Sequence, residues 1–576
     1  HKKGLSNMKH VKQKSKRMSK EEVEKKKKTI IRIFIAIIAI IIICIAGYIA
    51  NDYIILGKNK TTNLVINNTN VTGNLKQDVF IDGDNIYLSK QDLSNFFDKY
   101  IYEDEENNKI ITTYEDKIAT IGFDENEIEI NGSTVSTYAH AIEKDDSIFI
   151  PITELKDVYG IEIEYIADTD IVTVDSVARE QKKAIANGNL AVKSSTNFIA
   201  KTVDRVKKGD YVIVISDDGK NAKIRTANGK IGYVKSKKLA NTVVTRQEIE
   251  EQKPIEGKVN LVWDYYSQVA NAPDRSGTTI DGINVVSPAF YHLNTEGELE
   301  ENIGEEGKIY IDWAHSNGYQ VWAMVQNAGS GMMDVTSEIM KHYDNRQAII
   351  EKIDEGCMEY NLDGINIDFE NMKKEDIDLF SRFIIELEPR LKEIGAVLSV
   401  DVTAPDGSDT WSLCFDRTVL GDVADYLIFM AYDQYGASSD QAGTTAGYNW
   451  VELNIKKFLE TYEVESEKLV LAIPLYARLW TIDNNGIVDG RTAIPMNQID
   501  DVIPSDVERK WDDELKQNYV EYKEDGETKQ MWIEDIDSLK EKVSLIKEYN
   551  LGGVASWELG METEDVWGML KENLNN

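Results

Sequence analysis

Hydrophobic and polar positions follow three different patterns along the chain. A continuous apolar run occupies residues 30–50, where Arg32 is the only charged residue. Residues 76–241 contain short segments of period-two alternation separated by Asp, Asn and Gly, which indicates small β-rich modules. From residue 257 to the end, apolar runs of strand length alternate with segments of helical period such as 376–392. This last pattern predicts repeated β/α units.

The apolar run is long enough to cross a membrane, because about 20 helical residues span the roughly 30 Å hydrocarbon layer. A cleaved signal peptide is the alternative, but its apolar core is usually about 7–15 residues and ends in a small-x-small cleavage site. Residues 1–32 carry thirteen Lys and Arg against three Glu, and such a flank stays cytoplasmic. We therefore predict a basic cytoplasmic tail (1–29) and a single-pass signal anchor (30–50) in the cell membrane, with the remaining chain extracellular.

Two small modules are predicted between this anchor and the β/α region. After a polar stalk (51–75), residues 76–176 contain a weak repeat of strand, short helix and strand, which predicts an α+β module. Residues 188–241 are short alternating strands joined by Gly, Asp and Asn turns, and they predict a small all-β barrel. A charged linker (242–256) follows.

The last region, residues 257–576, contains eight strand candidates. They lie at 259–263, 283–290, 320–326, 364–370, 397–402, 426–433, 468–476 and 552–559. Eight β/α units in about 300 residues predict a closed (β/α)8 TIM barrel, with an open doubly wound sheet as the alternative. The gap between the seventh and eighth strands is too long for one helix and predicts an α+β insertion at about 477–550.

Composition excludes several kinds of chemistry. The chain has 65 Lys and Arg against 100 Asp and Glu, a net charge of −35, whereas a nucleic-acid partner requires basic surfaces. Three cysteines in 576 residues cannot form a disulfide framework. The six histidines are not clustered with cysteines. We therefore expect no nucleic-acid partner, no metal and no cofactor.

The fourth strand candidate carries the candidate chemistry. Because side chains alternate along a strand, Asn366, Asp368 and Glu370 share one face and the apolar residues between them take the other. The polar set should point into the barrel at the carboxyl end of the strand, where barrel enzymes hold their reactive groups. Two carboxylates roughly 6–7 Å apart along a strand perturb each other, which suits a general acid beside an anion. The alternative is an interior ion cluster, but this strand supplies no basic partner.

Residues 363–370, Asp-Gly-Ile-Asn-Ile-Asp-Phe-Glu, resemble the D-G-x-D-x-D-x-E signature of glycoside hydrolase family 18, the chitinase-like barrels. Met-Ala-Tyr-Asp at 430–433 and Trp557 lie where that family expects its motif on strand six and its aromatic residue on strand eight. The resemblance covers about 320 residues. Within the family, the sequence is most similar to the bacterial YaaH-type N-acetylglucosaminidases of spore cortex and cell wall.

The two small modules also resemble known domains. Residues 76–176 are similar to the copper amine oxidase N-terminal domain, a name that implies no copper chemistry, since His140 has no second ligand in the segment. Residues 188–241 resemble a bacterial SH3-type domain. Attachment to the cell wall and a passive spacer role are both compatible with that likeness.

The resemblance to family 18 implies a retaining mechanism assisted by the substrate. Glu370 would protonate the glycosidic oxygen, and the 2-acetamido oxygen of the substrate would attack the anomeric carbon. Asp368 would bind the acetamido N–H, Tyr432 would orient the acetamido oxygen, Asp433 would support the sugar, and Trp557 would stack beneath it. The predicted substrate-binding residues are Asp433, Trp557, Asn366 and Met430.

Two departures from the family pattern bear on function. Asn366 stands where many chitinases have Asp, so a like charge beside Asp368 is missing and a shifted pH profile is expected. The third strand lacks the S-x-G-G form common in chitinases. The predicted function is hydrolysis of N-acetylglucosamine linkages in the peptidoglycan of cell wall or spore cortex. A chitinase and a non-catalytic glycan-binding protein are the alternatives, and the presence of Glu370 disfavours the last.

Overall fold

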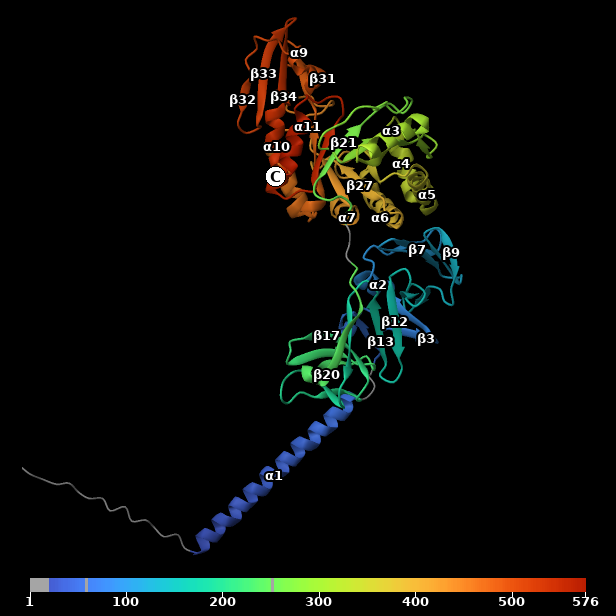
Figure 1. Cartoon of the computed structure of the whole chain (residues 1–576), viewed down its shortest axis with the longest axis vertical. Helices are drawn as coiled ribbons and strands as arrows, with labels where there is room; N and C mark the ends of the chain where they lie inside the picture. The colour runs from blue at the N-terminus through green and yellow to red at the C-terminus, as the bar shows by residue number, and fades with distance from the viewer. Residues whose placement is uncertain (1–19, 57–60, 250–252, 576) are drawn as a thin grey trace, which may run out of the picture. The chain divides into compact units, whose positions relative to one another are not determined.

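The computed structural model describes residues 20–56, 61–249 and 253–575 (Figure 1). Most of the predicted cytoplasmic tail therefore lies outside the described residues. The chain divides into two units: one comprises His1–Phe80 with Gly160–Ile249, and the other comprises Ile81–Tyr159 with Glu250–Asn576. This division does not decide the domain boundaries proposed from the sequence, which stay predictions.

Helix α1 (Lys20–Leu56) contains the predicted membrane segment. Its stretch Glu24–Gly47 is long and apolar enough to cross a bilayer. The described part of the chain leaves its apolar side chains uncovered, with Ile35 60% and Ile43 69% exposed. Such a surface is stable only in an apolar environment, which a bilayer supplies to membrane anchors and signal sequences alike.

The first unit holds two sheets in addition to α1. In the four-stranded sheet β12-β13-β1-β2, Asn63 pairs with Ile171 across parallel strands. Its strands are β1 (Asn63–Ile66), β2 (Thr69–Asn70), β12 (Ile161–Ile166) and β13 (Ile171–Ser176). The second sheet is antiparallel, in the order β16-β15-β19-β18-β17-β14-β20. Its strands are β14 (Gln181–Ala186), β15 (Leu190–Lys193), β16 (Thr202–Val206), β17 (Tyr211–Asp217), β18 (Asn221–Arg225), β19 (Ile231–Lys235) and β20 (Leu239–Arg246).

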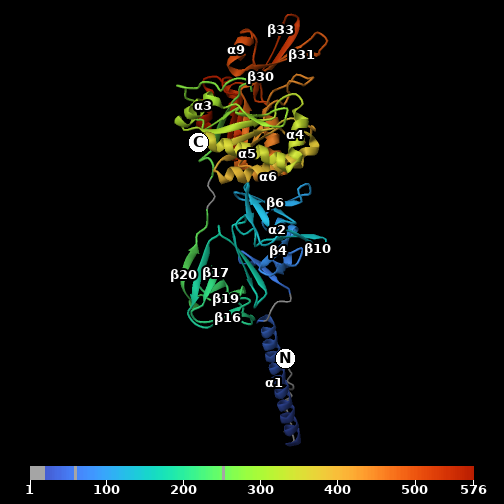
Figure 2. The same ribbon diagram turned by 90° about the vertical axis from the view of Figure 1, so that its right-hand side faces the viewer.

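The seven-stranded sheet encloses its own apolar core, which includes Val192, Val212 and Ile224. Figure 2 shows its strands curling around one another. The all-β character expected for residues 188–241 is thus present in a sheet that spans 181–246. Its likeness to an SH3-type domain stays a prediction.

In the second unit, residues 81–159 form small antiparallel sheets beside the short helix α2 (Lys90–Phe96). One sheet runs in chain order through β5 (Tyr102–Asp104), β6 (Lys109–Tyr114), β7 (Lys117–Gly122), β8 (Glu127–Ile130) and β9 (Ser133–Ser136). Another contains β4 (Asn85–Ser89), β11 (Ser147–Pro151) and β10 (Ile142–Lys144). Ile111 and Ile118 of the first sheet pack on Tyr343, which belongs to the large C-terminal region.

Eight parallel strands close into a barrel in that C-terminal region, which confirms the predicted TIM barrel. They are β21 (Val259–Asp264), β22 (Val285–Pro288), β25 (Gln320–Gln326), β26 (Gly364–Asp368), β27 (Val397–Val402), β28 (Tyr426–Met430), β29 (Leu469–Pro474) and β35 (Gly553–Trp557). The ring closes because β35 pairs in parallel with both β29 and β21. Each strand lies within or overlaps a segment predicted from the apolar pattern.

Helices cover the outside of the barrel (Figure 1). They are α3 (Gly304–Ser316), α4 (Met332–Lys341), α5 (Tyr343–Tyr360), α6 (Ile377–Glu393), α7 (Arg417–Val423), α8 (Tyr448–Lys456), α10 (Ile536–Glu548) and α11 (Val566–Asn575). Between the seventh and eighth barrel strands lies a five-stranded antiparallel sheet, β31-β30-β34-β33-β32, with the short α9 (Ile499–Val502). Its strands are β30 (Tyr476–Ile482), β31 (Val488–Pro495), β32 (Lys510–Asp512), β33 (Gln517–Glu524) and β34 (Glu527–Ile533). This is the expected α+β insertion.

Gly553 is required where the last strand enters the ring. Its φ is +153°, and a Cβ atom there would lie 2.0 Å from the carbonyl oxygen of Val259 on the neighbouring strand. A side chain would therefore push apart the pair of strands that closes the barrel.

We expect Gly553→Ala to lower the free energy of unfolding of the barrel by at least about 2 kcal/mol, because the clash is with backbone and cannot relax locally. Gly568→Ala is the matched control, since it lies in α11 with nothing within 4 Å of the added Cβ; it should raise stability by up to about 1 kcal/mol. Urea unfolding followed by tryptophan fluorescence measures both, because all ten tryptophans lie at 263–567. Equal stabilities for the two variants would contradict the packing argument.

Candidate active site

The alternation expected for the fourth barrel strand is present in β26. Ile365, Ile367 and Phe369 point outward into the core beneath the helices, where the Phe369 ring stacks on Phe383 of α6 at 5.9 Å. The residues between them, Asn366, Asp368 and Glu370, therefore face the barrel interior. Glu370 lies two residues beyond the end of the strand.

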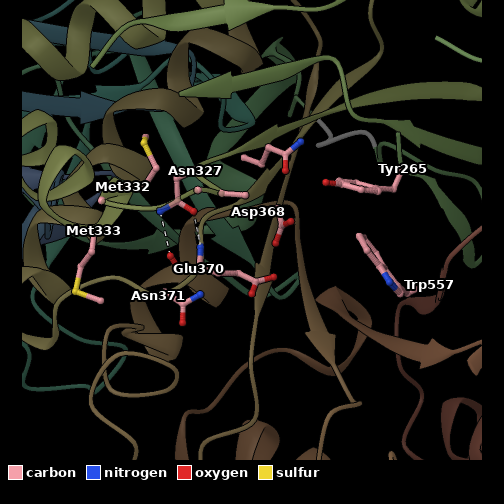
Figure 3. A pocket seen from close by; sticks show the side chains of 12 residues that line it. Tyr265, Asn327, Met332, Met333, Asp368, Glu370, Asn371 and Trp557 are labelled. Carbon is pink, nitrogen blue, oxygen red and sulfur yellow. Dashed lines mark hydrogen bonds between the residues drawn. The ribbon is translucent and has the colours of Figure 1, made fainter. Parts of the chain in front are cut away.

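A cavity of about 480 Å³ opens at this carboxyl end of the barrel. Figure 3 shows Asp368 and Glu370 between two walls, one with Met332 and Met333 and the other with Tyr265 and Trp557. Trp557 contacts Tyr265 at 5.6 Å between ring centres. The cavity therefore combines a pair of acids with an aromatic wall of the kind against which a sugar ring can pack.

Asp368 and Glu370 interact as one acid pair. Burial raises the pKa of Asp368 to about 6, with an opposing contribution from a hydrogen bond to Glu370. The pKa of Glu370 is raised well above its usual range by burial first, then by the Asp368 charge. Near neutral pH, Glu370 therefore holds the proton and Asp368 is the anion. Asp368 Oδ1 is buried and accepts no hydrogen bond from the described residues.

Asn327, in the loop after β25, fixes the position of Glu370. Its Oδ1 accepts a hydrogen bond from the Glu370 backbone N–H at 2.8 Å, and its Nδ2 donates to the Glu370 carbonyl oxygen at 3.1 Å (Figure 3). Asn327 is not among the site residues predicted from the sequence. No local signal identifies it, because the contact joins backbone and side chain across 43 positions.

Asn366 is fully enclosed and hydrogen-bonded beneath the acid pair. Its Oδ1 accepts from Trp263 Nε1 at 2.9 Å, and its Nδ2 donates to Ser399 Oγ at 3.0 Å and to Asp401 Oδ1 at 2.7 Å. With 0% of its surface exposed, the amide supports the floor of the site. It does not line the cavity formed by the described residues.

Asp401 on β27 is a third interior acid that the sequence analysis missed. It is 1% exposed, and its pKa is raised well above its usual range by burial and then by the charge of Asp368. Ser399 and Asp401 alternate with buried aliphatic residues along β27, which is a signal for an inward-facing acid. Recognising it requires knowing which face of that strand points inward.

The tyrosine and aspartate that follow β28 lie close to this acid pair. The phenol pKa of Tyr432 is raised by burial and by several acids, among them Asp368 and Glu370. Asp433 accepts hydrogen bonds from Tyr476 Oη at 2.7 Å and Arg478 Nη2 at 2.9 Å, and its charge contributes to the raised pKa of Glu370. Met430 is 5% exposed at the end of β28. Of the seven predicted residues, Asp368, Glu370 and Trp557 line the cavity.

Among the residues that the structure describes, no group of three or more His, Cys, Asp or Glu side chains has an arrangement that could hold a metal ion.

Two parts of the chain match the models of known protein families. Residues 261–562 match the family model of glycosyl hydrolases family 18, and residues 62–174 match the copper amine oxidase N-terminal domain. The chain is 24% identical to the uncharacterized glycosylase YvbX of Bacillus subtilis (strain 168) over 303 residues, which cover 50% of this chain and 84% of that protein. It is also 24% identical to the cortical fragment-lytic enzyme of the same organism over 239 residues, 40% of this chain and 54% of that enzyme.

Among solved structures, a chitinase from Chromobacterium violaceum ATCC 12472 aligns with a TM-score of 0.48 and 24% identity, covering 55% of this chain and 99% of that one. The family match covers more than half of the chain and includes the whole acid motif and Trp557. The chain therefore belongs to glycosyl hydrolases family 18, and its barrel is a glycoside hydrolase.

Proposed function

We propose that the barrel hydrolyses N-acetylglucosamine linkages in peptidoglycan by a retaining, substrate-assisted mechanism. The acid pair carries this proposal: Glu370 holds a proton at neutral pH, while Asp368 beside it is an anion whose buried Oδ1 has no partner among the described residues. Relatives that include a cortical fragment-lytic enzyme favour peptidoglycan as the substrate.

In this mechanism Glu370 donates its proton to the glycosidic oxygen as the bond breaks. Asp368 Oδ1 accepts the acetamido N–H of the sugar, which directs the acetamido oxygen to the anomeric carbon and stabilises the positive charge that develops there. Tyr432 orients the acetamido oxygen, and Trp557 supports the ring. The deprotonated Glu370 then takes a proton from the incoming water, whose oxygen bonds to the anomeric carbon as the bond from that carbon to the acetamido oxygen breaks.

Asp401 and Asn366 act as positioning residues in this proposal. An ionised Asp401 would repel the Asp368 anion. Asp401 therefore stays protonated in the working pH range. Asn366 Nδ2 donates a hydrogen bond to Asp401, and Asn366 Oδ1 accepts one from Trp263. These bonds hold the floor of the site without adding charge. The acid expected at position 366 in many chitinases is thus replaced by an amide, and a neutral acid lies on the next strand.

We further propose that α1 is an uncleaved signal anchor with a cytoplasmic N-terminus. The uncovered stretch Glu24–Gly47 and the preceding basic residues support it. The barrel would then work outside the cell membrane, where the wall glycan lies.

Glu370→Gln should lower kcat by about 100-fold or more, because the general acid is lost, while binding of glycan is retained. The matched control is Glu388→Gln: this acid on α6 also has a raised pKa, to about 8, yet it lies outside the cavity and its variant should keep normal activity. Digestion of purified peptidoglycan and of chito-oligosaccharides, with mass spectrometry of the new reducing ends, measures both. New muropeptides ending in N-acetylglucosamine support the proposal, whereas products from chito-oligosaccharides alone favour a chitinase.

De-N-acetylated peptidoglycan should be almost inert, because the attacking acetamido oxygen is absent. Rates on the same material before and after chemical re-acetylation provide the comparison. Cleavage at equal rates would refute the substrate-assisted mechanism and point to a protein nucleophile.

The acidic limb of kcat/KM should lie near pH 6, because activity is lost as Asp368 takes up a proton and its pKa is about 6. Asp401→Asn should leave this limb in place, since the side chain it replaces is already neutral there. Asn366→Asp should move the limb to higher pH, because a new acid beside Asp401 adds negative charge near Asp368. A limb that moves to lower pH in Asp401→Asn would show that Asp401 is ionised in the native enzyme.

A further inference from the structure

Two large apolar side chains project from the seven-stranded sheet of the first unit. Phe198 and Ile199 lie in the loop between β15 and β16, and they are 103% and 79% exposed. The same sheet encloses an apolar core that includes Val192 and Val206. Tyr211, Val243 and Val244 of the sheet are also exposed, but less fully, at 61%, 53% and 41%. Adjacent aromatic and aliphatic side chains at a loop tip, with no contact to that core, indicate a surface used for binding.

The loop is flanked by positive charge. Residues 181–246 carry fifteen Lys and Arg against four Asp, although the whole chain has 65 Lys and Arg against 100 Asp and Glu. Lys193 ends β15 and Lys201 lies just before β16, where Ser194 N–H donates to the Lys201 carbonyl oxygen at 2.8 Å across the base of the loop. Arg205 follows on β16 opposite Ala191.

The base of this loop lies beside the proposed membrane anchor. Helix α1 contacts β16, the strand that follows the loop. Six residues separate Leu56, the end of α1, from Asn63, the start of β1, so the chain can extend no more than about 25 Å between them.

The two sheets of the unit are joined, so this short connection also restrains the loop. Arg225 of β18 donates to both carboxylate oxygens of Asp175 on β13. Thr169 Oγ1, in the turn before β13, donates to the Asn228 carbonyl oxygen at 2.7 Å. The seven-stranded sheet is therefore held close to the point where α1 ends.

We propose that the loop 194–201 inserts into the outer leaflet of the membrane, with Phe198 and Ile199 at the boundary of headgroups and acyl chains. Lys193, Lys201 and Arg205 would contact the phosphates of anionic lipids around it. This inference rests on the proposed anchoring by α1. Apolar tips surrounded by basic residues bind bilayers by burying apolar area and pairing with anionic lipid, and the anchor keeps the loop at the surface at high effective concentration.

The test uses the full chain with Cys44→Ala, reconstituted into liposomes that contain phosphatidylglycerol. Asn197→Cys, next to Phe198, carries an environment-sensitive fluorophore, and Asp525→Cys in the β33–β34 turn carries it as the control. Cys357 and Cys414 are buried, at 3% and 0% exposed, and should not label. We expect nitroxide-labelled lipids to quench the label at position 197 at least about threefold more than the label at position 525.

The double variant Phe198→Asp and Ile199→Asp should reduce quenching at position 197 to the control value, and liposomes of phosphatidylcholine alone should reduce it in part. A chain that floats with liposomes while the position 197 label is quenched only by aqueous iodide overturns the insertion and leaves the anchor intact. A chain that does not float with either kind of liposome overturns the anchoring by α1, and the insertion with it.

Discussion

The site depends on one constraint: a closed barrel that holds the partly buried Asp368 and Glu370 and the buried Asp401 within reach of one another's charge. Three ionised carboxylates in a low-dielectric interior repel one another, so protons must be retained on some of them. The protons reside where the pKa is raised furthest, on Glu370 and Asp401. The same repulsion that destabilises the folded barrel thus supplies a proton donor beside an anion.

Two buried acids elsewhere in the barrel are each paired with a cation. Glu386 of α6 accepts two hydrogen bonds from Arg346 of α5, at 2.9 and 2.8 Å, and Glu534 pairs with Lys542 at 2.8 Å. In these pairs the carboxylate is neutralised by a cation, and the role is to hold helices and loops together. The pKa values of Asp368 and Glu370 are set by burial and by each other. This contrast argues against the alternative that Asp368 and Glu370 belong to an interior ion cluster, and it favours a catalytic role for them.

The sequence predicted the structure best where the local periodicity of apolar and polar residues determines it. Eight apolar runs located the barrel strands, and the alternation in 364–370 placed Asp368 and Glu370 in the interior before any geometry was known. Contacts that join distant segments were not readable in the same way: the pairing of Asn63 with Ile171 and the clamp of Asn327 on Glu370 depend on the closed fold. Asp401 lies between these cases, because its alternation is local but its partner Asn366 is on another strand.

Charge is distributed unevenly along the chain. Residues 257–576 carry 26 Lys and Arg against 62 Asp and Glu, whereas residues 181–246 carry fifteen against four. A bilayer with anionic lipids attracts the basic segment and repels the acidic one, although salt limits both effects to about 10 Å from the surface. If α1 anchors the chain as proposed, a surface of this kind would attract the basic sheet and repel the acidic barrel. The charge of both segments is therefore compatible with the proposal of an anchored glycosidase that acts on a glycan outside the membrane.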